Sequence, residues 1–200
     1  GQRHPGTTSR RQESVRGNLC RGNERRKTRV IAVVGSQNSG KTTTVEKLTK
    51  ELARRGYKVA AVKHIPEPNF TIDTKGKDTW RFARAGAKMI VAVSAEEIAT
   101  IEKVVSKDLS LEEILRKCKN SDITILEGFR KLVAKKADIP KIVVVKSEKE
   151  AEDALETFKP IIAFTGPCST MKLGLKVPYV DILTNAAKLA DIVAEYLEAV

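Results

Sequence analysis

Apolar runs that predict strands alternate with apolar stripes that predict helices along most of the chain. The first run spans residues 30–34, is rich in β-branched residues and is followed by a glycine, as expected of a strand buried on both faces. Val45, Leu48 and Leu52 follow at i, i+3 and i+7, which predicts a helix that Gly56 closes. Further apolar runs predict strands at residues 57–62, 89–93, 123–126, 142–145 and 161–164.

Pairs of serine and glutamate predict where several helices begin. In a capping box, a serine and a glutamate three positions later satisfy backbone amides at the start of a helix. This spacing predicts helix starts at Ser94, Ser110 and Ser147. The last helix has the clearest apolar stripe, formed by Leu189, Ile192, Val193, Tyr196 and Leu197. Because strands and helices alternate, the sequence predicts an α/β fold with a mainly parallel sheet, helices on both faces, and a ligand beyond the carboxyl ends of the strands.

Length and composition indicate one globular domain. The chain has 200 residues, of which 41% are hydrophobic and 31% charged, and no apolar run reaches the roughly 18 residues that a membrane span requires. Cys20, Cys118 and Cys168 lie far apart without a C-x-x-C pair, so the spacing predicts neither a disulfide framework nor a zinc knuckle. We therefore expect a reducing, cytoplasmic location and no membrane.

Positive charge is concentrated at the start of the chain. Residues 1–29 hold nine Lys/Arg and two Glu, which leaves +7 of the formal +12 there and +5 on the other 171 residues. We expect a basic, disordered leader over residues 1–28 and a nucleotide-binding domain over residues 29–200, because the leader lacks apolar periodicity. The leader is either foreign to the natural chain or an electrostatic arm for RNA or an acidic partner. With aromatics at 4% of residues, base stacking is poorly supported and nucleic acid is not the expected partner.

A phosphate-binding pattern follows the first predicted strand. Gly35-x-x-x-x-Gly40-Lys41-Thr42 matches the Walker A motif. Its glycines permit the tight path that turns backbone N–H groups inward as an anion nest, and the helix that starts there points its positive dipole end at the phosphates. Lys41 would reach the β- and γ-phosphates, and the Thr42 hydroxyl would bind Mg²⁺.

A carboxylate must complete such a magnesium site. Glu127 is the best candidate, because it ends the apolar run at residues 123–126 and precedes a glycine; the alternative is a surface acid at a strand end. Asp73 and Asp78, in the long polar connection that ends at residue 78, compete for this role or act on a bridging water. With Lys41, they are the candidate catalytic residues.

Several other residues have less specific interpretations. Lys63, Arg81, Arg84 and Arg130 are candidates for binding phosphates or an anionic substrate. Trp80 and Phe82 share an amphipathic segment and are expected in core or hinge packing. The chain has only two histidines, so we do not expect metal delivery, which needs clustered ligands.

Four motifs follow the phosphate-binding pattern in the order Lys63-His64, Asp73-x-x-Gly76-Lys77-Asp78-Thr79-x-Arg81, Ala85-Gly86-Ala87 and Leu126-Glu127-Gly128-Phe129. Together they resemble the MobB family, the P-loop GTP-binding proteins of molybdopterin-guanine dinucleotide biosynthesis, and the resemblance covers about residues 29–200. The chain departs from the family at Ile65-Pro66-Glu67-Pro68, where members often carry further histidines, and at Thr74-Lys75, where a proline-containing step is frequent. Neither departure touches the phosphate-binding motif.

The resemblance implies a P-loop fold related to dethiobiotin synthetase and the nickel-insertion GTPases, a homodimer, and weak GTP hydrolysis. It implies GTP and Mg²⁺ as cofactors, and an accessory role beside a MobA-type guanylyltransferase and molybdopterin-bearing proteins. By family position, Thr42 and Glu127 would bind magnesium, and residues 73–78 would form a switch-like loop. The phosphates would bind Gly35, Ser36, Gln37, Asn38, Ser39, Gly40, Lys41, Thr42 and Thr43.

Two other functions fit the phosphate-binding motif. A P-loop kinase or ligase would use Arg81, Arg84 or Lys63 to bind a small anionic metabolite. A nucleotide-regulated nucleic-acid-binding protein would use the basic leader. The choice of GTP over ATP depends on the family resemblance alone, because the chain contains no Asn-Lys-x-Asp element.

Overall fold

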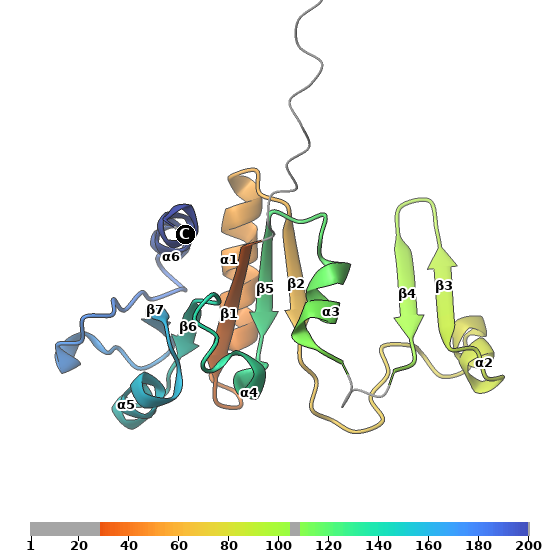
Figure 1. The fold of residues 1–200 in the computed structure, drawn as a ribbon, viewed down its shortest axis with the longest axis horizontal. Coiled ribbons are helices and arrows are strands. Elements are labelled where there is room, and N and C mark those ends of the chain that lie inside the picture. Colours follow the sequence, from red (N-terminus) through yellow and green to blue (C-terminus); the bar gives the residue numbers. More distant parts are fainter. Residues whose placement is uncertain (1–28, 105–108, 200) are drawn as a thin grey trace, which may run out of the picture.

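A five-stranded parallel sheet forms the centre of the structure. The computed structural model describes residues 29–104 and 109–199, so the expected leader over residues 1–28 lies outside the described residues. The strands are β1 (Arg29–Gly35), β2 (Val59–Lys63), β5 (Ile123–Glu127), β6 (Lys141–Val144) and β7 (Ile161–Thr165). They lie in the order β2-β5-β1-β6-β7, and each neighbouring pair is parallel (Figure 1). The predicted α/β class with a mainly parallel sheet is confirmed.

Helices cover both faces of this sheet. On one face lie α1 (Lys41–Arg54) and α6 (Ala186–Glu198), and on the other lie α3 (Leu111–Lys117), α4 (Arg130–Val133) and α5 (Glu148–Thr157). A short 3₁₀ helix, η2 (Met171–Leu173), lies in the connection from β7 to α6. In the described part of the chain, no helix is long and apolar enough to cross a membrane.

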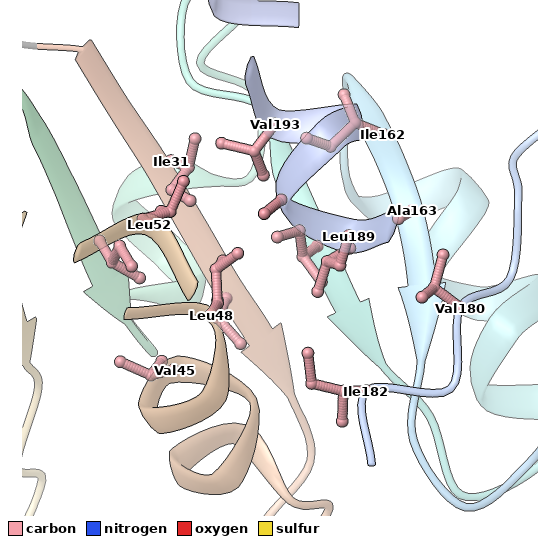
Figure 2. Close-up of a cluster of buried hydrophobic side chains, with 14 of the residues drawn as sticks. Ile31, Val45, Leu48, Leu52, Ile162, Ala163, Val180, Ile182, Leu189 and Val193 are labelled. Carbon is pink, nitrogen blue, oxygen red and sulfur yellow. The ribbon is translucent and has the colours of Figure 1, made fainter. Parts of the chain in front are cut away.

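The predicted apolar stripes of α1 and α6 form the core of the first face. Val45, Leu48 and Leu52 of α1 lie against the sheet beside Leu189 and Val193 of α6 (Figure 2). All five side chains are buried. Burying side chains of this kind stabilises the fold by about 1.5–3 kcal/mol each, so these two helices are fixed mainly by their apolar stripes.

Two of the three predicted helix starts are confirmed on the second face. The Ser110 hydroxyl accepts the Glu113 backbone N–H and the Glu113 carboxylate accepts the Ser110 N–H, which is a complete capping box at α3. Ser147 caps α5 by accepting the Glu150 N–H. Each cap is typically worth about 1 kcal/mol.

The helix predicted at Ser94 is wrong, because this serine closes a hairpin turn. β3 (Met89–Val93) pairs antiparallel with β4 (Ile98–Glu102) in a separate two-stranded sheet. The Ser94 hydroxyl accepts the N–H of Glu97, so the same serine–glutamate spacing serves a turn here. Four residues separate the strands, too few for the helical crossover that a parallel pair needs.

The hairpin and α2 (Asp78–Arg84) lie beyond β2, at one side of the main sheet (Figure 1). α2 packs on β3 but buries none of its own residues. The expected core packing of Trp80 and Phe82 is therefore not found: Phe82 is 56% exposed, and the Arg84 guanidinium lies 5.9 Å from the ring centre of the partly buried Trp80.

Candidate nucleotide-binding site

The strand order places a crevice at the carboxyl ends of β1 and β6. From β1 the chain crosses through α1 to β2 at one edge of the sheet, whereas from β6 it crosses through α5 to β7 at the other edge. The connections therefore diverge between β1 and β6, which is where open α/β sheets bind ligands. Residues 35–42, which we name the phosphate loop, lie at this position. Lys146, just beyond β6, ties the two sides together by donating to the Gln37 carbonyl at 3.0 Å.

Close packing and an unusual backbone conformation explain both glycines of the phosphate loop. A side chain at Gly35 would place its Cβ 2.5 Å from the Val144 carbonyl oxygen and 2.6 Å from Ser39 Oγ. Gly40 has φ 102° at the start of α1, a conformation that favours glycine. Ser39 Oγ is buried and has no hydrogen-bond partner among the described residues. An unpaired hydroxyl beside a helix start is a polar group that a bound anion can satisfy.

Lys41 lies in a strongly positive environment. Its Nζ donates to the Ser36 carbonyl at 2.6 Å. Desolvation lowers the pKa of Lys41, the nearby charges of Lys63, Arg130 and Lys146 lower it further, and the Glu127 carboxylate opposes them. Several cations around one carboxylate leave a surplus of positive charge, so the site electrostatically favours a polyanion.

Thr42, Glu127 and Lys63 form a triangle beside the phosphate loop. The Thr42 hydroxyl donates to Glu127 Oε1 at 2.9 Å. Lys63 Nζ donates to the same carboxylate oxygen at 2.8 Å and to Thr42 Oγ1 at 3.1 Å. Glu127 is 7% exposed, and it is the register partner of Lys63 in the β2–β5 pair. A hydroxyl and a carboxylate are ligands that Mg²⁺ prefers, and a cationic group already contacts both, so the predicted pair Thr42 and Glu127 fits a magnesium ion.

The predicted residues Asp73 and Asp78 do not join this triangle. Asp73 accepts from the Thr74 N–H at 2.8 Å and from the Thr79 hydroxyl at 2.9 Å, and Asp78 pairs with Arg81 at 3.4 Å. These contacts are local, and α2, which begins at Asp78, lies on the far side of β2 from the phosphate loop (Figure 1). Their catalytic roles stay predictions. Arg81 and Arg84 lie in the same helix and are likewise away from the loop.

The sequence did not indicate the contacts of Lys63 and Lys146. Both residues stand at the carboxyl end of a strand, Lys63 as the last residue of β2 and Lys146 two positions beyond β6. This position was the available signal, since the carboxyl ends of parallel strands meet at one edge of the sheet.

Over residues 29–104 and 109–199, no group of three or more His, Cys, Asp and Glu residues could hold a metal ion.

The parallel sheet and the phosphate loop at the carboxyl end of β1 together define a P-loop protein of the α/β class. Within this class, the sequence model of the MobB family, described as molybdopterin guanine dinucleotide synthesis protein B, matches residues 30–166. The chain belongs to this family.

Relatives and solved structures agree with this assignment. The chain is 38% identical over 138 residues to a Methanocaldococcus jannaschii protein named as a molybdopterin-guanine dinucleotide biosynthesis adapter, covering 67% of this chain and 54% of that protein. It is 32% identical over 121 residues to the adapter protein of that name from Haemophilus influenzae, covering 60% of this chain and 64% of the relative. The chain thus spans between about half and two thirds of these relatives.

Two crystal structures show the same fold. A structure of molybdopterin-guanine biosynthesis protein B superimposes with a TM-score of 0.64 at 26% identity, covering 84% of this chain and all but 1% of that one. Bacillus subtilis MobB superimposes with a TM-score of 0.64 at 23% identity over 82% of this chain and 96% of the other, a likeness of fold alone.

Proposed function

We propose that the chain is a Mg²⁺-dependent GTP-binding adapter protein of molybdopterin-guanine dinucleotide biosynthesis, with slow GTP hydrolysis. The observation that carries this proposal is the contact between Thr42 and Glu127 beside a Walker A loop, in a chain of the MobB family. The relatives named above as adapter proteins support the pathway.

The phosphate loop would bind the nucleotide with groups that are already oriented. Backbone N–H groups between Gly35 and Gly40, and the first turn of α1, would donate to the phosphates. Lys41, which now donates to the Ser36 carbonyl, would exchange this weak neutral acceptor for the β- and γ-phosphates. Desolvation and then the neighbouring cations lower the pKa of Lys41, and a bound phosphate would offset both by supplying a negative charge beside the ammonium group.

Thr42 and Glu127 would hold magnesium. When bound, Mg²⁺ would neutralise negative charge on the β- and γ-phosphate oxygens. The chain's own part is to fix the Thr42 hydroxyl at the start of α1 and the Glu127 carboxylate at the end of β5, a few ångströms apart. We infer a turnover of about 10⁻⁴ to 10⁻² s⁻¹, typical of GTPases that act mainly by positioning. Asp73 and Asp78 would take part only after residues 64–78 rearrange, because their present contacts are local.

We propose that the chain forms a homodimer through the hairpin. Met89, Val91 and Val93 alternate along β3 on one face and are 57%, 52% and 72% exposed, whereas Ile90 on the other face is 4% exposed. Ile98, the register partner of Val93, is 69% exposed on the neighbouring strand. An isolated two-stranded hairpin is marginal in water, so a second copy packed on this apolar face would stabilise it.

A MobA-type guanylyltransferase and molybdopterin-bearing proteins would be the partners of this adapter, and the reactions would take place in the cytoplasm. The adapter role explains why a slow nucleotide hydrolase is useful: the bound nucleotide would set how long a partner is held. A pull-down of the guanylyltransferase that depends on GTP would support this step.

Calorimetric titration with GTP and ATP, each with and without Mg²⁺, tests the proposed function. We expect Mg²⁺-dependent binding with a preference for GTP. A preference for ATP would instead favour a kinase or ligase, and brisk ATP hydrolysis by the isolated protein would rule out the adapter role.

A further inference from the structure

The ammonium group of Lys63 lies between the two side chains that are proposed to hold magnesium. Its Nζ contacts Glu127 Oε1 at 2.8 Å and Thr42 Oγ1 at 3.1 Å. These are the same two oxygen atoms that are joined by the 2.9 Å hydrogen bond from Thr42 to Glu127. The lysine therefore contacts a hydroxyl and a carboxylate in the way a bound metal ion would.

Burial of Glu127 explains why a cation is needed here. The residue is 7% exposed, and a buried carboxylate is costly unless a positive charge and hydrogen bonds compensate it. Lys41 also lies near Glu127, but its Nζ donates to the Ser36 carbonyl. In the described structure, Lys63 is the residue that forms an ion pair with Glu127.

Lys63 is anchored at its backbone and free at its side chain. Its register with Glu127 is fixed by the β2–β5 pairing, and the next residue, His64, donates its backbone N–H to the Glu127 carbonyl at 3.0 Å. The Lys63 side chain is nevertheless 52% exposed. The ammonium group can therefore leave the carboxylate for solvent or a phosphate while β2 stays in place.

We propose that Lys63 is a built-in cation that competes with Mg²⁺ for Thr42 Oγ1 and Glu127 Oε1. Two cations cannot occupy the same pair of oxygen atoms, because their charges repel and the oxygens are shared. The nucleotide then binds in two modes. Without metal, Lys63 stays beside Glu127, whereas with Mg²⁺ bound, Lys63 is displaced toward the phosphates. The nucleotide modes rest on the proposed function, whereas the competition itself concerns the protein and a divalent cation alone.

The test compares wild type with K63M, which keeps the length of the side chain and removes its charge. K58M is the matched control, because Lys58 is exposed and immediately precedes Val59, the first residue of the strand that Lys63 ends. A non-hydrolysable GTP analogue is titrated by calorimetry in EDTA and across a Mg²⁺ series. We expect K63M to bind the analogue about fivefold more weakly in EDTA and to half-saturate at about fivefold less Mg²⁺, typical of the loss of one partly exposed charge contact. K58M should match wild type.

The proposal is overturned if K63M and wild type need the same Mg²⁺ concentration, or if K63M needs more. A purely structural lysine would give that result together with a lower melting temperature. If wild type binds the analogue in neither condition, the proposed function fails and a second measurement decides the competition. In that measurement, Mn²⁺ is titrated into nucleotide-free protein and followed by electron paramagnetic resonance. Tighter Mn²⁺ binding by K63M supports the competition, and equal binding overturns it.

Discussion

Thr42 donates a 2.9 Å hydrogen bond to Glu127, although 85 positions separate the two residues in the sequence. Thr42 is the second residue of α1, and Glu127 is the last residue of β5, the strand beside β1. The contact therefore joins the phosphate loop to the neighbouring strand before any ligand binds. Two further features belong to the phosphate loop: a buried Ser39 hydroxyl that has no hydrogen-bond partner among the described residues, and cations gathered around Lys41.

Glutamine at position 127 should remove the dependence of GTP binding on magnesium. The amide keeps an oxygen for the Thr42 hydroxyl but loses the negative charge that a divalent cation needs. We expect the affinity of E127Q for GTP in Mg²⁺ to fall to within about twofold of its value in EDTA, since a lost charged contact costs roughly 1.5–3 kcal/mol. Calorimetry measures both values. E150Q is the control, because Glu150 lines the β6 side of the loop, and equal magnesium dependence in E127Q and E150Q would contradict the prediction.

Alanine at position 41 should greatly weaken nucleotide binding without unfolding the protein. Lys41 is held among other cations, and its pKa is lowered first by desolvation, so its removal relieves strain in the free protein. We expect GTP affinity to fall about 100-fold, as for two lost charge-assisted hydrogen bonds. The melting temperature should stay the same or rise. K50A, which removes an exposed lysine of the same helix, should bind GTP normally. Unchanged affinity in K41A would show that the loop does not bind phosphates.

The two glycine variants G35A and G86A should fail in different ways. A Cβ at Gly35 would lie 2.5 Å from a backbone oxygen of β6, which forces the loop to shift and costs about 1–3 kcal/mol. Gly86 has open space around it but φ 106°, so G86A is strained without a clash. We expect both variants to lower the melting temperature and only G35A to lose GTP affinity. Normal GTP binding by G35A would mean that the loop tolerates the extra methyl group.

Lys141 should make stability depend on pH in the alkaline range. This fully buried lysine donates to the Lys136 and Lys159 carbonyls at 2.6 Å each, and burial lowers its pKa from 10.5 to about 8, against the opposing charge of Asp138. Between about pH 8 and pH 10.5, Lys141 is protonated in the unfolded chain and deprotonated in the folded chain. The free energy of unfolding should therefore rise with pH in this range.

Urea unfolding at pH 7.5 and 9.5 measures this effect of Lys141. K141M removes the titrating group, so its stability should rise less over this range than that of wild type. K141M should also be less stable at both pH values, because the Lys136 and Lys159 carbonyls lose their donor. Equal pH slopes in the two proteins would contradict the lowered pKa.

Acidic substitutions on the exposed face of β3 should separate the proposed dimer. V91D/V93D places two charges on the apolar face without touching the buried Ile90. We expect a monomer by sedimentation velocity where wild type is a dimer. L183D is the control, because Leu183 is 66% exposed in the connection before α6. A dimeric V91D/V93D would place the interface elsewhere.

The sequence predicted most of the fold because the relevant signals are local. The strand at residues 30–34, the stripe of α1 and the caps at Ser110 and Ser147 depend on neighbours within one or two turns. The phosphate loop and Glu127 were predicted for the same reason, since each follows directly from a strand end. The structure places these two residues in contact, and their binding of magnesium stays a prediction.

The features that sequence reasoning missed depend on partners distant in the chain. Ser94 and Glu97 have the spacing of a helix cap, but β3 pairs with β4, and this pairing decides the local structure. Trp80 and Phe82 look like core residues by composition, yet α2 packs on the small two-stranded sheet of β3 and β4 and buries none of its own residues. Lys63 lies 64 positions from Glu127; its place at a strand end was the available signal, but its ion pair depends on the pairing of β2 with β5.

The register of β2 links the candidate nucleotide-binding site, at the carboxyl ends of the strands, to a contact at their amino ends. At the amino ends, the Asp122 carboxylate accepts the Lys58 N–H at 2.7 Å, and the next residues, Val59 and Ile123, are the first register pair of β2 and β5. A slip of one residue would bring His64 or Val62 opposite Glu127 in place of Lys63. Asp122, about five residues from Glu127 along β5, thus helps decide which side chain of β2 lies opposite the proposed metal ligand.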